Sequence, residues 1–152
     1  MQVTTVLAID ASDQRVWQII TDVGSYPEWN PFIRELPGKL LPGEPIVFRF
    51  SLIFGRSMQA RAIVLKAVSS RELRWAGVFC GAWLFRAEHF HIIDPDRSGV
   101  RFVHGEIFSG LLAPLLAPFL RRWGERTYGA VNLALKQRAE LRSAQISIGV
   151  WP

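Results

Sequence analysis

The segment APLLAPFLRRWGERTYGAVNLALKQRAELR, residues 113–142, decides the fold that we predict for this chain. Its large apolar residues recur at helical spacing and therefore share one face, which comprises Leu116, Phe119, Leu120, Trp123, Val131 and Leu135. A helix of about 30 residues is about 45 Å long, because each residue adds about 1.5 Å. That is long for a chain of 152 residues, so we expect the helix to lie across a whole sheet.

Seven segments that precede this helix have the alternation and composition of β-strands. They are residues 3–10, 32–41, 46–54, 58–68, 72–79, 83–93 and 100–108. Between the first two, Ser12 can cap a short helix, and residues 25–31 predict a second short helix or turn that contains two prolines. The order strand, two short helices, six strands and long helix predicts an α+β fold with an antiparallel sheet.

Composition restricts the class of protein. Hydrophobic residues make up 49%, with ten Phe and six Trp, which allows a large core or a lined cavity and argues against disorder. The net charge of +5 is spread from Arg15 to Arg142 without a dense basic run, so we expect no nucleic-acid partner. A single cysteine, Cys80, excludes an intrachain disulfide. Because we find no signal-peptide pattern and no apolar stretch long enough to span a bilayer, we predict a cytoplasmic protein.

Several short blocks of sequence resemble the START-like (SRPBCC) superfamily, in particular its polyketide cyclase/dehydrase-like branch. The blocks are Ile9-Asp-Ala-Ser12, Val16-Trp17, Thr21-Asp22, Tyr26-Pro-Glu-Trp-Asn-Pro31 and Glu106-Ile-Phe-Ser-Gly110. The resemblance implies a helix-grip fold, in which a curved seven-stranded antiparallel sheet wraps around the long C-terminal helix and encloses a cavity. It covers about residues 3–142, so we expect a single ligand-binding domain over residues 1–142 and a tail over residues 143–152.

The last two predicted strands carry the residues most suited to chemistry. If Arg101 faces water, the alternation of side chains turns His104 and Glu106 inward, and the same argument turns His89 inward on the preceding strand. His91 shares the inward parity of His89, but it lies close to the turn, so we expect it near the rim. Because the two strands form a hairpin, we expect His89, His104 and Glu106 to be neighbours on the cavity wall.

Two imidazoles and a carboxylate among aromatic rings allow three roles. They can act as general acid and base, they can orient the polar end of a ligand, or they can satisfy one another structurally. An arginine or Tyr128 from the long helix could also pair with Glu106. The spacing of these residues matches no metal motif, so we predict neither a metal site nor a cofactor.

An aromatic-rich interior with few polar groups favours binding of a mainly apolar small molecule. The resemblance implies ligands such as a lipid, a quinone or a polyketide. Trp29 would either close the cavity mouth over the ligand or pack on the long helix, and the remaining rings are core residues that can also line the cavity. The residues that we predict to bind ligand are Trp29, Phe48, Phe50, Trp75, Phe79, Phe85, His89, His104, Glu106, Phe108, Leu116, Phe119 and Trp123.

Two other functions stay open at this stage. An enzyme of the cyclase or dehydratase type would use His89, His104 and Glu106 as its catalytic group. A peripheral membrane or protein-interaction module would instead dock residues 111–120 on lipid, with the following arginine pair at the headgroups. The sequence does not decide whether the chain catalyses a reaction, which ligand it holds, or whether it is a monomer or a homodimer.

Overall fold

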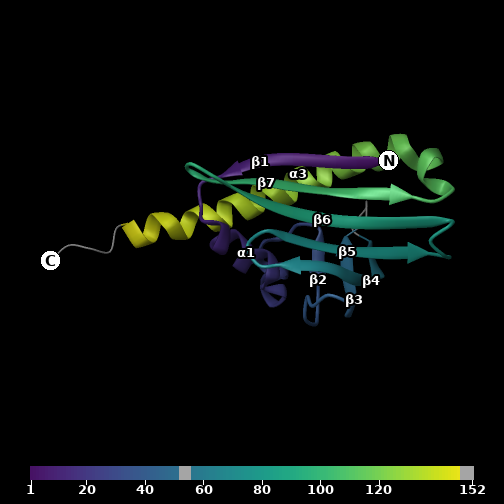
Figure 1. The fold of residues 1–152 in the computed structure, drawn as a ribbon, viewed down its shortest axis with the longest axis horizontal. Helices are drawn as coiled ribbons and strands as arrows, with labels where there is room; N and C mark the ends of the chain where they lie inside the picture. The colour runs from purple at the N-terminus through teal and green to yellow at the C-terminus, as the bar shows by residue number, and fades with distance from the viewer. Residues whose placement is uncertain (52–55, 148–152) are drawn as a thin grey trace.

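The structure is a computed structural model that describes residues 1–51 and 56–147, with side chains described up to residue 141. The elements within these residues are β1 (Gln2–Ile9), α1 (Asp13–Thr21), the 3-10 turn η1 (Val23–Ser25), α2 (Tyr26–Trp29), β2 (Ile33–Glu35), β3 (Pro45–Ser51), β4 (Ser57–Val68), β5 (Glu72–Phe79), β6 (Phe85–Asp96), β7 (Gly99–Ser109) and α3 (Leu112–Ser147). The strands form one antiparallel sheet in the order β1-β7-β6-β5-β4-β3-β2 (Figure 1).

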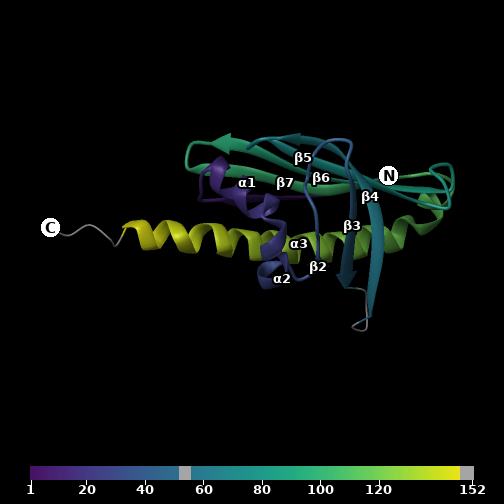
Figure 2. The ribbon, with the colours of Figure 1, turned by 90° about the horizontal axis from the view of Figure 1, so that it is seen from below.

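The sheet curves around one side of the long helix α3. Figure 2 shows β5, β6 and β7 lying along α3, while β3 and β4 turn across it near its N-terminal half. The short helices α1 and α2 lie beside the C-terminal half of α3 and cover the side that the sheet leaves open. The predicted helix-grip α+β fold, with seven antiparallel strands and two short N-terminal helices, is therefore confirmed.

Local chemistry explains the connection from β1 to β2. The Ser12 hydroxyl caps α1 by accepting a hydrogen bond from the backbone N–H of Arg15 at 3.2 Å. The Asn30 side chain then fixes the start of β2, since its Oδ1 accepts from the backbone N–H groups of Phe32 at 2.9 Å and Ile33 at 2.8 Å. The Asn30 bonds thus join the end of α2 to the start of β2.

The observed strands differ from the predicted ones mainly at their ends. β4 and β5 agree with their predicted ranges, whereas the segment predicted as a strand over residues 32–41 contributes only Ile33–Glu35 to the sheet. Pro37 and Gly38 interrupt it, and Gly38 has a φ of +109°, a conformation that strands do not adopt. The segment predicted as a strand over residues 46–54 forms β3, and its residues 52–54 lie outside the described residues.

The helix α3 contains 36 residues, so it is about 54 Å long and begins and ends beyond the predicted range of 113–142. Residues 143–147 of the predicted tail belong to it, and residues 148–152 lie outside the described residues. Its apolar face is buried at Leu120, Val131 and Leu135, but Leu116 and Phe119 are 37% and 55% exposed. None of the described helices is long and apolar enough to cross a bilayer.

Candidate functional site

Four polar side chains from β6 and β7 form a square on the face of the sheet that α3 covers. In the register of the two strands, His89 lies opposite Glu106 and His91 lies opposite His104. Residues two apart on a strand point to the same face, so all four side chains meet there. The predicted inward orientation of His89, His104 and Glu106 is confirmed.

Two side chains of α3 form hydrogen bonds with residues of this square. The Tyr128 hydroxyl donates a hydrogen bond to Oε2 of Glu106, and Asn132 bonds the ring of His104. Tyr128 and Asn132 are four residues apart and therefore lie on one helix face, about 6 Å apart along the axis. Glu106 and His104 are two residues apart on a strand, about 6.8 Å, so the helix step nearly matches the strand step.

A chain of hydrogen bonds determines which ring nitrogen carries the proton in His104 and in His89. The Thr5 hydroxyl donates its proton to the backbone carbonyl of His104 at 3.0 Å. Because that proton is used, the Thr5 hydroxyl oxygen can only accept from Asn132, whose amide N–H donates to it at 2.9 Å. The Asn132 carbonyl oxygen is then directed at Nδ1 of His104, 2.7 Å away, and accepts its proton. His104 therefore presents a lone pair on Nε2, and Nε2–H of His89 donates to it at 3.0 Å.

Burial keeps all three histidines uncharged near neutral pH. Loss of hydration lowers the pKa of His104 to about 4, and the hydrogen bond to Asn132 offsets only part of this effect. Burial also lowers the pKa of His89 and His91 well below the usual value, and proximity to His104 lowers both further. The imidazoles are thus available as hydrogen-bond partners or ligands with free lone pairs rather than as cations.

Glu106 is the acidic member of the square. Burial raises the pKa of its carboxyl group to about 7, and the hydrogen bond from Tyr128 opposes this shift only in part. Oε1 of Glu106 lies 4.0 Å from Nδ1 of His89. A carboxyl group with this pKa exchanges its proton near neutral pH, which is the property of a general acid or base.

Aromatic rings enclose the square. Trp75 of β5 lies opposite His89 in the register and stacks on its ring, with centroids 4.6 Å apart and planes at 18°. Phe102 stacks on His91 with centroids 5.6 Å apart. Nδ1 of His91 is buried and has no hydrogen-bond partner among the described residues.

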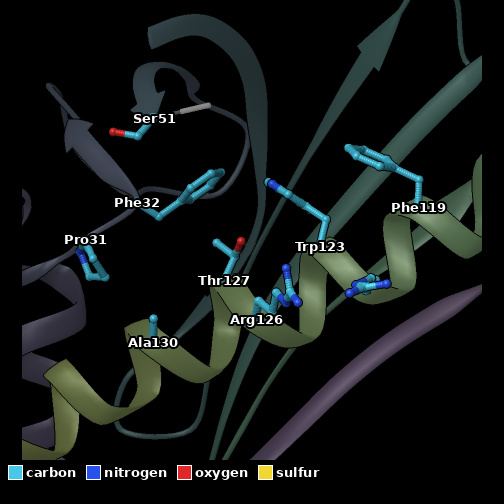
Figure 3. A pocket seen from close by; sticks show the side chains of 9 residues that line it. Pro31, Phe32, Ser51, Phe119, Trp123, Arg126, Thr127 and Ala130 are labelled. Carbon is cyan, nitrogen blue, oxygen red and sulfur yellow. The ribbon is translucent and has the colours of Figure 1, made fainter. Parts of the chain in front are cut away.

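An open pocket of about 500 Å³ lies beside the square, between α3 and the start of β2 (Figure 3). Its wall includes the rings of Phe32, Phe119 and Trp123 and the guanidinium groups of Arg122 and Arg126. Trp123 packs edge-on against Phe32 at 5.3 Å between centroids and against Tyr128 at 6.1 Å. The Trp123 ring therefore connects the pocket wall to Tyr128, which belongs with Trp75 and the four residues of the square to one buried cluster.

The structure divides the predicted ligand residues among three places. Phe119 and Trp123 line the pocket, whereas His89, His104, Glu106 and Trp75 belong to the buried cluster behind it. Phe50 packs on Phe32 with centroids 5.1 Å apart. Phe48 contacts both Phe50, at 5.8 Å between centroids, and Trp75, at 6.5 Å. Phe85 stacks on Phe108, and Trp29 packs on Tyr26.

Besides Phe119 in the pocket wall, two of the predicted ligand residues are exposed rather than in the core. Phe79 is 63% exposed at the end of β5, and Leu116 is 37% exposed on α3.

The predicted rim position of His91 is also wrong, because β6 continues to Asp96 and leaves His91 only 4% exposed. Asn132 was not among the predicted site residues; its signal is a polar residue four positions after Tyr128 on an otherwise apolar helix face.

Comparison with known proteins gives a family and a fold. Residues 1–140 match the family described as "Polyketide cyclase / dehydrase and lipid transport". No curated protein sequence matches the chain.

Several solved structures are similar. Protein NE0264 from Nitrosomonas europaea shares 15% identity with a TM-score of 0.73, covering 95% of this chain and 97% of the other. A START superfamily protein from Mycobacterium smegmatis shares 18% identity with a TM-score of 0.72, covering 92% and 97%. The di-domain ARO/CYC StfQ from the steffimycin biosynthetic pathway shares 13% identity with a TM-score of 0.77, covering 94% of this chain and 51% of StfQ. Identities at this level establish the shared fold alone.

Proposed function

Because the chain belongs to the family of polyketide cyclases, dehydrases and lipid-transport proteins, we propose that it binds a mainly apolar small molecule such as a lipid, a quinone or a polyketide. The observation that carries the proposal is the open pocket with Phe32, Phe119 and Trp123 in its wall. Its volume of about 500 Å³ lies within the range of small-molecule sites, about 300–1,000 Å³.

The pocket also offers a place for an acidic group. Arg122 and Arg126 line it, and neither forms an ion pair with any residue that the structure describes. A guanidinium group pairs strongly with a carboxylate or phosphate. We therefore expect the preferred ligand to have an apolar body and an anionic end.

The test is a displacement titration with a fluorescent fatty-acid probe, in which oleate and oleyl alcohol compete for the site. We expect oleate to bind more tightly than the alcohol, and Arg126→Gln to reduce this difference. Thr127→Trp should weaken binding by roughly tenfold or more, because Thr127 lines the pocket and the new ring would fill it. The matched control is Leu133→Trp, which adds the same ring at a 56% exposed position of the same helix that does not line the pocket. Equal binding by both variants, or no binding by the wild type, contradicts the proposal.

A second candidate function is that of a cyclase or dehydratase. The observation that favours it is the placement of Glu106, which Tyr128 holds beside His89, while Trp123 contacts both Tyr128 and the Phe32 ring in the pocket wall. A rotation of the Trp123 ring would extend the pocket toward the carboxyl group. A substrate bound in the pocket could then exchange a proton with Glu106.

The enzymatic candidate predicts a separation of binding from turnover. With a poly-β-ketone substrate, Glu106→Gln should retain binding and lose roughly 100-fold or more in turnover, the usual contribution of a general acid or base. Glu125→Gln, which changes an exposed carboxyl group of α3, should leave both unchanged. Undiminished turnover by Glu106→Gln would remove Glu106 from the mechanism.

The surroundings of the pocket favour loading from a lipid surface. Leu111, Leu115 and Phe119 are 69%, 75% and 55% exposed at the N-terminal end of α3. Trp83, which is 71% exposed, is adjacent, because its carbonyl accepts a hydrogen bond from the N–H of Leu111 at 3.0 Å. Arg121 follows these residues and suits anionic headgroups.

A cytoplasmic location and a monomeric or dimeric state remain predictions.

A further inference from the structure

We propose that His89, His91 and His104 bind one divalent transition-metal ion, such as Zn²⁺, inside the domain. They are all of the histidines of the chain. All three are buried, and one ring nitrogen from each lies within 4.8 Å of the other two. Their sequence spacing matches no linear motif, because the register of β6 and β7 brings them together. The inference is independent of the ligand pocket, whose lining includes none of them.

The two Nε2 atoms of His89 and His104 already point at one another across 3.0 Å. In a tetrahedral site with bonds of about 2.0–2.1 Å, neighbouring ligand nitrogens are about 3.3 Å apart. If the two nitrogens move apart by a few tenths of an ångström and both rings tilt so that their lone pairs converge, they can bind one metal ion in place of the proton that they share.

Partners behind these two rings are placed to orient them as ligands. The Asn132 carbonyl accepts the Nδ1 proton of His104 at 2.7 Å and so leaves the Nε2 lone pair free. When Nε2 of His89 binds a metal, its proton moves to Nδ1, which lies 4.0 Å from the Glu106 carboxyl group. A carbonyl that accepts the second ring N–H of a ligating histidine fixes its ring and raises its basicity, and a carboxyl group does the same once it comes within hydrogen-bond distance.

His91 supplies the third ligand. It is 4% exposed, and its ring centroid lies 4.6 Å from that of His104 and 4.8 Å from that of His89. Its Nδ1 has no hydrogen-bond partner among the described residues, although buried polar atoms are normally bonded. A metal ion would satisfy this atom. Three imidazole ligands leave a fourth position for an oxygen donor, either a water molecule or a ligand group.

The first test uses the wild-type protein, purified without a histidine tag and freed of metal by a chelator. We expect Co²⁺ to bind with a stoichiometry of one ion per chain and to produce the visible absorption of a tetrahedral site, and Zn²⁺ to displace it. Zn²⁺ should also raise Tm, since a ligand that binds the folded state stabilises it. Substoichiometric Co²⁺ binding by folded wild-type protein overturns the proposal, whether or not oleate binds.

Variants assign the ligands. His91→Gln and His104→Gln should each weaken Co²⁺ binding by roughly 100-fold or more, and Asn132→Ala, which keeps all three ligands but removes the orienting carbonyl and the amide N–H that bonds Thr5, by roughly tenfold. Cys80→Ser is the control, because Cys80 is the only cysteine and is exposed. It should bind Co²⁺ as the wild type does. If His91→Gln is folded by circular dichroism and keeps wild-type affinity, the three-histidine site is wrong.

Discussion

Glu106 illustrates how neighbouring atoms set the behaviour of a single side chain. Its carboxyl group lies between the Tyr128 hydroxyl and the His89 ring, beneath α3. Because burial favours the uncharged form, the folded protein holds a proton on this group up to about pH 7. The usual pKa of a glutamate is lower by more than two units, so folding and protonation of Glu106 are linked.

The linkage predicts the effect of pH on Glu106→Gln in chelator-treated protein. As pH rises from about 4.5 to about 7, the unfolded chain loses its proton first, so the wild type loses stability relative to a variant that does not titrate. We expect Glu106→Gln to raise Tm relative to the wild type at about pH 8 and to change it little at about pH 5, with a maximal gain of about 3 kcal/mol. Thermal melts across this range measure the effect.

Glu125→Gln serves as the control in these melts, since Glu125 is exposed on α3. Its difference from the wild type should not change systematically with pH. A Glu106→Gln variant that is clearly less stable than the wild type at about pH 8 would show that the carboxylate is held as an ion, contrary to the raised pKa.

Strand alternation was sufficient to predict His89, His104 and Glu106 as neighbours, because one charged residue per strand determines which side chains face inward. His91 was misplaced because the prediction depended on where β6 ends, and a strand end depends on its partner. Asn132 could not be placed, since its role depends on the rotation of α3 against the sheet. The hydrogen bond from Thr5 likewise needs the pairing of β1 with β7, which joins distant parts of the chain.

At the scale of elements, β7 joins β1 to the rest of the sheet, because it pairs with both β1 and β6. Gly105 lies at its middle, where a Cβ atom would be 2.3 Å from the carbonyl oxygen of Val3 and 2.8 Å from the ring of Phe90. The packing of β1 and the Phe90 ring against Gly105 therefore leaves no room for a side chain at this position. Gly129 of α3 is different, because a Cβ there would meet nothing within 4 Å.

These two glycines give a matched pair of alanine substitutions. Gly105→Ala should destabilise the domain by at least about 2 kcal/mol, since neither β1 nor the ring of Phe90 can retreat without disrupting the sheet. Gly129→Ala should stabilise it by up to about 1 kcal/mol, the difference in helix propensity. Urea unfolding at equilibrium measures both. A tolerated Gly105→Ala or a destabilising Gly129→Ala would show that the packing of β7 or α3 is not as described.

Element types were more predictable than element ends. β5 begins and ends as predicted because a turn lies before it and a loop after it, whereas β2 is much shorter than its apolar sequence suggested. At the edge of the sheet, β2 has only β3 as a partner, so pairing ends where Pro37 and Gly38 redirect the chain. α3 was predicted from its periodicity, but the exposure of Leu116 was not, because periodicity does not tell where the sheet stops covering the helix.

At the scale of the whole molecule, the ligand pocket and the exposed apolar residues lie at the same end of α3. Phe119 belongs to both, since it lines the pocket and is 55% exposed. The sequence predicted a cavity from the resemblance, but it could not predict this pocket. Its walls come from segments far apart in the chain, and their spacing depends on how Phe32 and Trp123 pack.

This arrangement predicts binding to lipid vesicles. Vesicles that contain anionic phosphatidylserine should sediment with the wild type at low salt, and less so at high salt, because headgroup attraction is screened. Leu115→Glu should reduce the bound fraction, since Leu115 is 75% exposed and lies one helical turn before Phe119, which lines the pocket. Val6→Glu is the control, because Val6 is a 50% exposed apolar residue on β1 and is not one of the exposed residues Leu111, Leu115, Phe119 and Trp83. Equal loss of binding in both variants, or none in either, contradicts a docking surface at this end.

The pairing of β1 with β7 has a consequence for synthesis on the ribosome. Thr5 and His104, which face one another across these strands, are 99 positions apart. At about 5–20 residues per second, β1 emerges roughly 5–20 s before its partner strand. During this interval Val3 and Ile9, which are 3% and 1% exposed in the folded domain, have neither β7 nor α3 to cover them. We therefore expect the nascent chain to rely on chaperones and to complete its fold only after α3 has been released.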